Sequence, residues 1–141
     1  MAEVLYAFFC EDLRVEQSGQ TTAVGIWGER AYVGAFPAML KSLAFHAYVS
    51  NHAREHFHFV VHMRGPFDPG EIRQEGDLVM EGHHIGQNIN LLLAPVVFTE
   101  PGVMSATLVI GSDPPIERTI RLEVSLRQPV ANNLPEPAQA L

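Results

Sequence analysis

Basic residues are scarce in this chain. Lysine and arginine together number 9, against 16 aspartates and glutamates, which gives a formal net charge of −7. A surface that binds nucleic acid needs clustered lysine and arginine to displace counterions from the phosphates, and the sequence contains no such cluster. An anionic membrane demands the same positive charge. We therefore expect neither a nucleic acid nor a membrane as partner.

Cysteine is almost absent as well. Cys10 is the only one, so the chain can form no internal disulfide. It lies in a strongly apolar run, where a thiol is more often a small core residue than a nucleophile. The sequence also lacks a G-x-S-x-G nucleophile elbow, a phosphate-binding loop and a dinucleotide fingerprint. These absences predict no catalytic residue and no cofactor.

Long apolar runs are missing too. No stretch approaches the ~18 apolar residues of a membrane-spanning helix. Glu3 stands where a signal peptide would carry positive charge, and the apolar run after it ends at Cys10. We accordingly expect a soluble cytoplasmic protein.

The chain does contain enough apolar residues for a core. It has 141 residues, of which 47% are hydrophobic and 18% are charged. A domain near this size buries roughly 68–70% of the surface that its unfolded chain exposes. We predict a single domain over residues 1–127. Residues 128–141 show no periodicity and contain two closely spaced prolines, so we predict a flexible tail there.

The stretch from Leu43 to Met63 carries the strongest structural pattern. Every second residue is apolar from Leu43 to Val49, and again from Phe57 to Met63. Alternation with a period of two is typical of half-buried strands. Residues 50–56 between them predict a turn. We therefore expect a hairpin that pairs Val49 with Phe57 and Leu43 with Met63.

Short alternating segments recur through the rest of the chain, separated by turns rich in glycine and proline. We see no amphipathic helix, although residues 38–40 are expected to close one helical turn. The pattern predicts an all-β fold, an antiparallel immunoglobulin-like β-sandwich of roughly seven to nine strands. A pair of cysteines between the sheets is absent, which excludes the antibody branch. The predicted core comprises Leu43, Phe45, Phe57, Phe59, Val61, Leu108, Leu122 and Val124.

The first strand, residues 4–10, is apolar on both faces. Strict alternation places Val4, Tyr6, Phe8 and Cys10 on one side and Leu5, Ala7 and Phe9 on the other. A sandwich strand normally exposes one face to water, so a second apolar face marks an interaction surface. We expect a homodimer, or a stable complex with another protein, with residues 4–10 at the interface and Leu5 and Phe9 in need of a cover.

The sequence His52-Ala53-Arg54-Glu55-His56 matches H-x-x-E-H. In that motif two histidines one helical turn apart bind zinc, and the glutamate activates a water molecule. The chemistry requires a helix of several turns, but strand-like sequence ends at Ser50 and begins again at Phe57. The alternative interpretation is a polar hairpin loop.

A second histidine pattern is the H-x-H of His56 and His58. Ligands two apart on a strand can bind one metal ion, as in cupin-type sandwiches, but no glutamate follows at the cupin spacing. In the predicted hairpin His46 lies diagonally from His58 and His62, so the imidazoles form one row. Such a row would gain positive charge together as the pH falls towards about 5, and we predict weaker association there.

Several segments resemble a family of short, uncharacterised bacterial proteins known only as a domain of unknown function. They are residues 7–16, the Gly25-Ile26-Trp27-Gly28 block, Phe36-Pro37 followed by Leu40, and residues 96–102. The resemblance covers most of residues 4–126. It implies a β-sandwich and carries over no activity and no catalytic residue.

Two hypotheses for function follow. The first is a non-enzymatic β-sandwich module that binds a protein, a second copy of itself or a small ligand. The second is a small metal-dependent enzyme, zinc-dependent or cupin-like, that uses His52, Glu55, His56 and His58. Metal analysis of the purified protein would separate them.

Overall fold

The computed structural model describes residues 2–18, 20–51, 53–83, 86–111 and 113–127. Within these ranges the regular structure consists of eleven β-strands. None of the described residues forms a helix that is long and apolar enough to cross a membrane. The alternating segments of the sequence thus become strands, as predicted.

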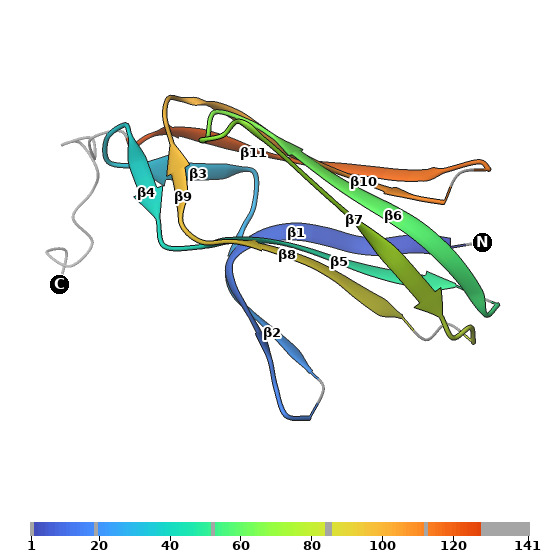
Figure 1. Cartoon of the computed structure of the whole chain (residues 1–141). Coiled ribbons are helices and arrows are strands. Elements are labelled where there is room, and N and C mark those ends of the chain that lie inside the picture. Colours follow the sequence, from blue (N-terminus) through green and yellow to red (C-terminus); the bar gives the residue numbers. More distant parts are fainter. Residues whose placement is uncertain (1, 19, 52, 84–85, 112, 128–141) are drawn as a thin grey trace, which may run out of the picture.

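Two sheets form the layers of a sandwich (Figure 1). The first sheet has the order β2-β1-β5-β8 and contains β1 (Ala2–Val15), β2 (Thr21–Trp27), β5 (Leu43–Asn51) and β8 (Gln87–Leu93). The second sheet has the order β3-β11-β10-β6-β7 and contains β3 (Arg30–Val33), β6 (Glu55–Arg64), β7 (Glu71–Met80), β10 (Gly102–Ile110) and β11 (Ile116–Leu126). Every pairing is antiparallel except that of β3 with β11.

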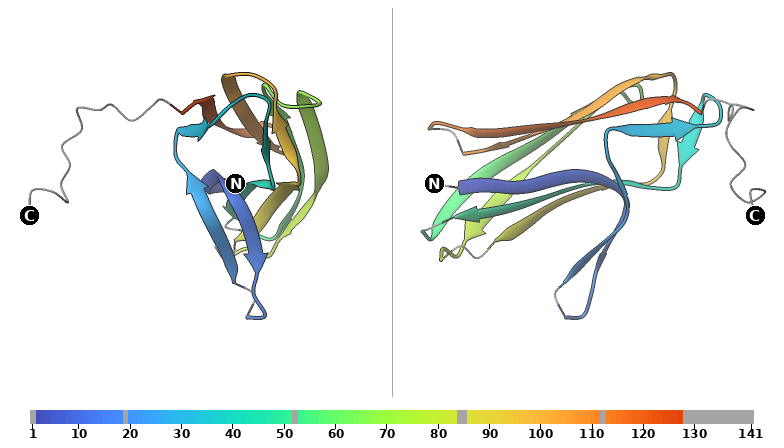
Figure 2. Two further views of the ribbon diagram at one scale, coloured as in Figure 1. Left: turned by 90° about the vertical axis from the view of Figure 1, so that its left-hand side faces the viewer. Right: turned by 180° about the vertical axis from the view of Figure 1, so that it is seen from behind.

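A small ribbon lies at one end of the sandwich, and the hairpin of β1 and β2 projects away from the first sheet (Figure 2). The ribbon pairs β4 (Ala38–Leu40) with β9 (Val96–Phe98). The prediction of a helical turn at residues 38–40 is therefore wrong. Three residues are too few to show a period, and pairing with a distant strand decides their conformation. The ribbon and the short β3 raise the number of strands above the seven to nine predicted.

The core lies between the two sheets. Leu43 and Phe45 of the first sheet and Val61, Leu108, Leu122 and Val124 of the second are at most 1% exposed. Phe57 and Phe59 are partly exposed but pack against this cluster. The predicted core is confirmed, with two members at its margin. The strands end at Leu126, inside the predicted domain of residues 1–127, and the predicted tail lies outside the described residues.

The predicted hairpin of residues 43–63 is wrong in its pairing, although its strand limits agree with β5 and β6 to within two residues. β5 pairs with β1 and β8, and β6 pairs with β10 and β7, so the two strands belong to different sheets. Val49 and Phe57 thus face the same core from opposite layers. Alternation reports which side chains point inward, but it is identical for a hairpin and for a link between sheets.

Candidate functional site

The outer face of the first sheet carries an aromatic cluster. Tyr6 pairs with Tyr48, and Phe8 pairs with His46 across β1 and β5. The Tyr6 and Tyr48 rings stack with centroids 5.4 Å apart, and Tyr6 and Phe8 with centroids 6.0 Å apart. His46 lies beneath them, 5.1 Å from the Phe8 ring. We call these four residues the aromatic patch.

A bulge in β1 decides which residues form this patch. The register between β1 and β5 shifts between Val4 and Tyr6, so Leu5 is the extra residue. A bulge of one residue reverses the faces of everything beyond it. Val4 therefore shares the inner face with Ala7 and Phe9, and the strict alternation predicted for residues 4–10 is wrong.

Phe9 and Cys10 are consequently not free to meet a partner. Phe9 is 2% exposed and meets Phe45 edge-on at 6.2 Å inside the core. Cys10 is fully buried, and burial raises the pKa of its thiol, which keeps it protonated. The prediction of a core cysteine is confirmed, whereas the strip of Leu5 and Phe9 is not formed. Leu5 alone of that pair is exposed, at 48%.

The polar neighbours of the patch come from β8. His46 is only 3% exposed and donates a hydrogen bond from Nδ1 to Asn90 Oδ1 at 2.5 Å. The cross-strand rows are Tyr6–Tyr48–Asn88, Phe8–His46–Asn90 and Cys10–Ala44–Leu92. No charged residue occurs in these rows. The sequence offered no signal for the role of Asn90, because sheet pairing between distant segments brings it to His46.

The geometry of the rings limits what the patch can bind. The planes of Tyr6 and Tyr48 differ by only 10°, as do those of Tyr6 and Phe8, so the three rings lie nearly parallel. A nucleic-acid base stacks on an exposed ring face. The rows of the patch contain no lysine or arginine that could contact a phosphate, so this apolar, uncharged surface suits contact with another protein instead.

The outer face of the second sheet carries a different cluster, which we call the histidine–carboxylate ladder. It comprises His56, His58 and His62 of β6 and Glu71, Glu75 and Asp77 of β7. The cross-strand register puts His58 opposite Asp77, and His62 hydrogen-bonds to Glu71. The predicted row of imidazoles that includes His46 is wrong, because His46 lies on the outer face of the other sheet.

His58 is the most strongly held member of the ladder. It donates hydrogen bonds from Nδ1 to Asp77 Oδ1 at 3.3 Å and from Nε2 to Glu75 Oε2 at 2.9 Å. The bond to Asp77, followed by that to Glu75, raises the pKa of His58 above its usual value. Because both ring nitrogens donate, the arrangement favours an imidazolium cation.

The predicted metal ligands do not converge. Glu55 and His56 are successive residues of strand β6, so they point to opposite faces, and the helical spacing that H-x-x-E-H requires is not formed there. His52 lies outside the described residues. Within the described part of the chain, no three histidine, cysteine, aspartate or glutamate side chains lie together in a way that could hold a metal ion.

No protein-family model matches this sequence, and no curated protein is significantly similar to it. The resemblance to short bacterial proteins of unknown function therefore stays a prediction.

Proposed function

We propose that this chain is a non-enzymatic binding module, an immunoglobulin-like sandwich that associates through the aromatic patch. The observation that carries the proposal is the exposed, uncharged outer face of the first sheet. Tyr6 is 45% exposed there although its ring is stacked on both sides, and Leu92 at the other edge is 52% exposed. Aromatic side chains on an uncharged surface are typical of the centre of a protein–protein interface.

The partner that fits this face is a second copy of the chain. Two copies repel each other through a net charge of −7 each, yet the rows of the patch carry no charge, and the carboxylates of Glu3 and Asp12 lie at its two ends on β1. Apposing the two patches therefore buries aromatic surface without burying carboxylates. A two-fold interface requires a self-complementary surface, and face-to-face packing of sheets about 10 Å apart provides one.

A pair of matched tyrosine substitutions tests the homodimer. Tyr6→Glu places a charge inside the patch and should yield a folded monomer of 15.6 kDa in sedimentation equilibrium. Tyr32→Glu is the control, because Tyr32 is 57% exposed on β3 of the other sheet and should leave the dimer intact. A wild type that sediments as a monomer at the highest attainable concentration would contradict self-association.

A charge at Phe9, the other residue of the predicted apolar strip, would not report on the interface. Phe9 lies in the core against Phe45, so a glutamate there would bury an unpaired charge and unfold the protein.

The alternative function, a metal-dependent enzyme, predicts that protein purified without a tag contains stoichiometric metal and that His56→Ala loses it. The extended backbone at Glu55 and His56 gives no support to that alternative.

A further inference from the structure

The edge of β11 is only partly used by the fold. β3 pairs with β11 from Glu123 to Leu126, whereas β10 pairs with β11 from Ile116 onward. Residues 116–122 therefore have no strand on the side opposite β10 among the described residues. Figure 1 shows β11 running well beyond β3, with β1 of the other sheet as its neighbour across the sandwich. Unpaired strand edges present backbone donors and acceptors that can pair with another chain.

One charged residue stands on the inner side of this free edge. The register of β10 and β11 places Ile116, Arg118 and Ile120 opposite the buried Ile110, Leu108 and Ala106. Arg118 thus belongs to the core-facing row, yet it is exposed because no strand covers it. Within the described part of the chain no carboxylate forms an ion pair with Arg118.

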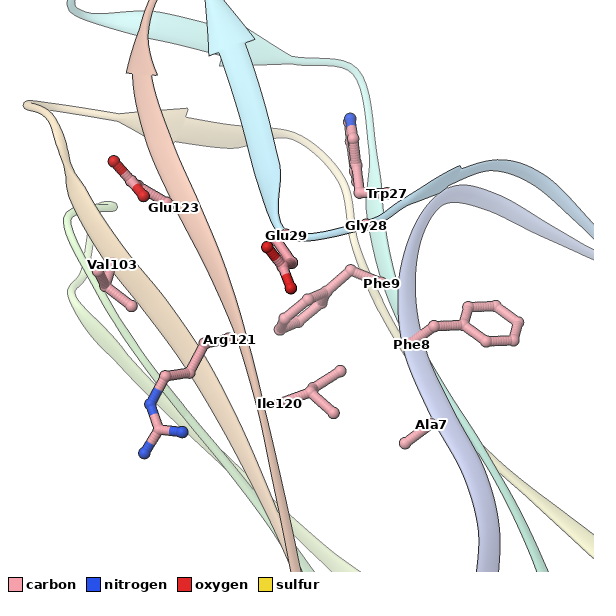
Figure 3. Close-up of a pocket in the computed structure, with 10 residues that line it drawn as sticks. All are labelled: Ala7, Phe8, Phe9, Trp27, Gly28, Glu29, Val103, Ile120, Arg121 and Glu123. Carbon is pink, nitrogen blue, oxygen red and sulfur yellow. The ribbon is translucent and has the colours of Figure 1, made fainter.

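An apolar groove runs beside the same edge. It has a volume of about 610 Å³ and lies between β1, β11 and the segment that enters β3. Figure 3 shows Phe9 and Ile120 pointing towards one another in this space, while Phe8 and Arg121 point away from it. Ala7 also lines the groove, and Glu29 closes one end by accepting a backbone hydrogen bond from Glu123 at 2.8 Å.

We propose that this edge binds an extended segment of a partner polypeptide, which adds a strand to β11 beside residues 116–122. Its backbone pairs with the free edge, its apolar side chains lie next to Ile116 and Ile120, and a carboxylate lies opposite Arg118. Strand addition takes affinity from main-chain hydrogen bonds and specificity from alternate side chains. This is a second binding site, at the edge of the second sheet, whereas the aromatic patch lies on the outer face of the first.

A protective role for Arg118 is the competing explanation. Inward-pointing charges on edge strands prevent unwanted pairing. A purely protective charge requires no neighbouring apolar surface, whereas Arg118 lies between the partly buried Ile116 and Ile120 in the same row, and Ile120 lines the apolar groove. The two explanations differ in the response to an acidic peptide, which binds the wild type only if the edge is a site.

Fluorescence anisotropy with labelled peptides tests the proposal on the full chain. The first peptide has threonine at every second position and valine, glutamate and valine at the positions between, and it is long enough to span residues 116–122. The second peptide is identical except that lysine replaces the glutamate. We expect the glutamate peptide to bind the wild type about fivefold to tenfold more tightly than the lysine peptide. Arg118→Glu should reverse this preference, whereas Arg73→Glu, on the strand β7 at the far edge of the same sheet, should preserve it.

Further measurements keep the result unambiguous. Methylation of alternate peptide nitrogens should abolish binding, because it removes main-chain donors. Tyr6→Glu should bind the peptide like the wild type, and Arg118→Glu should leave the oligomeric state unchanged. The homodimer and the peptide site can therefore fail independently of each other. Absence of peptide binding, or a preference that survives Arg118→Glu, would overturn the proposal. Self-association of Arg118→Val without any peptide binding would assign Arg118 to edge protection.

Discussion

The ring of Tyr48 lies directly on the backbone of Gly86. A Cβ atom on Gly86 would come within 2.0 Å of Tyr48 Cζ and 2.2 Å of its hydroxyl oxygen. The same ring stacks on Tyr6, so the glycine helps to position the aromatic patch. The absence of a side chain at Gly86, directly before β8, therefore helps to form the proposed interface.

Gly86→Ala should displace the Tyr48 ring. Forcing extra volume into a packed site costs about 1–3 kcal/mol, measurable by urea unfolding, and we expect dimerisation to weaken in parallel. Gly34→Ala is the matched control, because nothing lies within 4 Å of a Cβ atom there, and its effect should stay within about 0.5 kcal/mol. Equal stability of the two variants would show that Tyr48 moves without cost.

His58→Gln should change how stability depends on pH. Hydrogen bonds to Asp77 and Glu75 raise the pKa of His58, so the folded state favours its protonated form. This contribution is complete below the ordinary pKa of about 6.5 and is lost as the pH rises through the higher folded-state pKa. The wild type should melt about 1 °C above the variant near pH 5.5 and equal it near pH 8.5, a small difference because the pair is exposed. A difference that is constant with pH would contradict this assignment.

At the scale of the element, burial along β5 and β6 differs although both alternate. β5 lies between β1 and β8, and nearly all of its residues are buried. β6 lies next to the edge strand β7, where the Phe59 ring covers the bare backbone of Gly76 and stays partly exposed. The position of a strand within its sheet thus decides how much each phenylalanine contributes.

Two phenylalanine truncations should show this difference. Phe45 is 1% exposed in the middle of the first sheet, so Phe45→Ala should cost about 3–5 kcal/mol. Phe59→Ala removes a half-buried ring and should cost roughly half as much, about 2 kcal/mol. Urea unfolding of both variants measures the two values. A larger loss for Phe59 than for Phe45 would mean that the edge of the second sheet is better packed than its position suggests.

At the scale of the whole molecule, the two outer faces have opposite character. The first sheet presents stacked aromatic rings without charge, and the second presents the histidine–carboxylate ladder. The predicted loss of association at low pH assumed that His46 shared one face with His58 and His62. Since the sandwich separates them, replacing His58 should alter stability and leave self-association through the patch unchanged.

The eleven strands of the described residues lie between Ala2 and Leu126, so we expect a chain that ends at Arg127 to fold like the full chain. We expect melting temperatures that agree within about 2 °C, because every described strand pairing is retained. Differential scanning calorimetry of the two proteins measures this. A markedly less stable shortened chain would place residues 128–141 within the structural domain.

The sequence by itself determined that the fold is all-β, the approximate limits of β5 and β6 and most of the core. Alternation is a local property of a strand, so Leu43 and Val61 could be placed inside without knowledge of their neighbours. The sequence also contains a signal for the exposure of Arg118 that the predictions did not use. This charged residue occupies a position that is otherwise apolar in the alternation from Ile116 to Leu126.

Only the tertiary structure decided which strands pair and which residues of β1 face outward. Strand pairing depends on hydrogen bonds between segments far apart in the chain, so β5 could join β1 and β8 rather than β6. The bulge at Leu5 arises from that pairing, and it turns Phe8 outward and Phe9 inward. The aromatic patch forms because β1 pairs with β5. The edge of β11 is free at residues 116–122 because β3 pairs only with residues 123–126, so strand pairing decides both features.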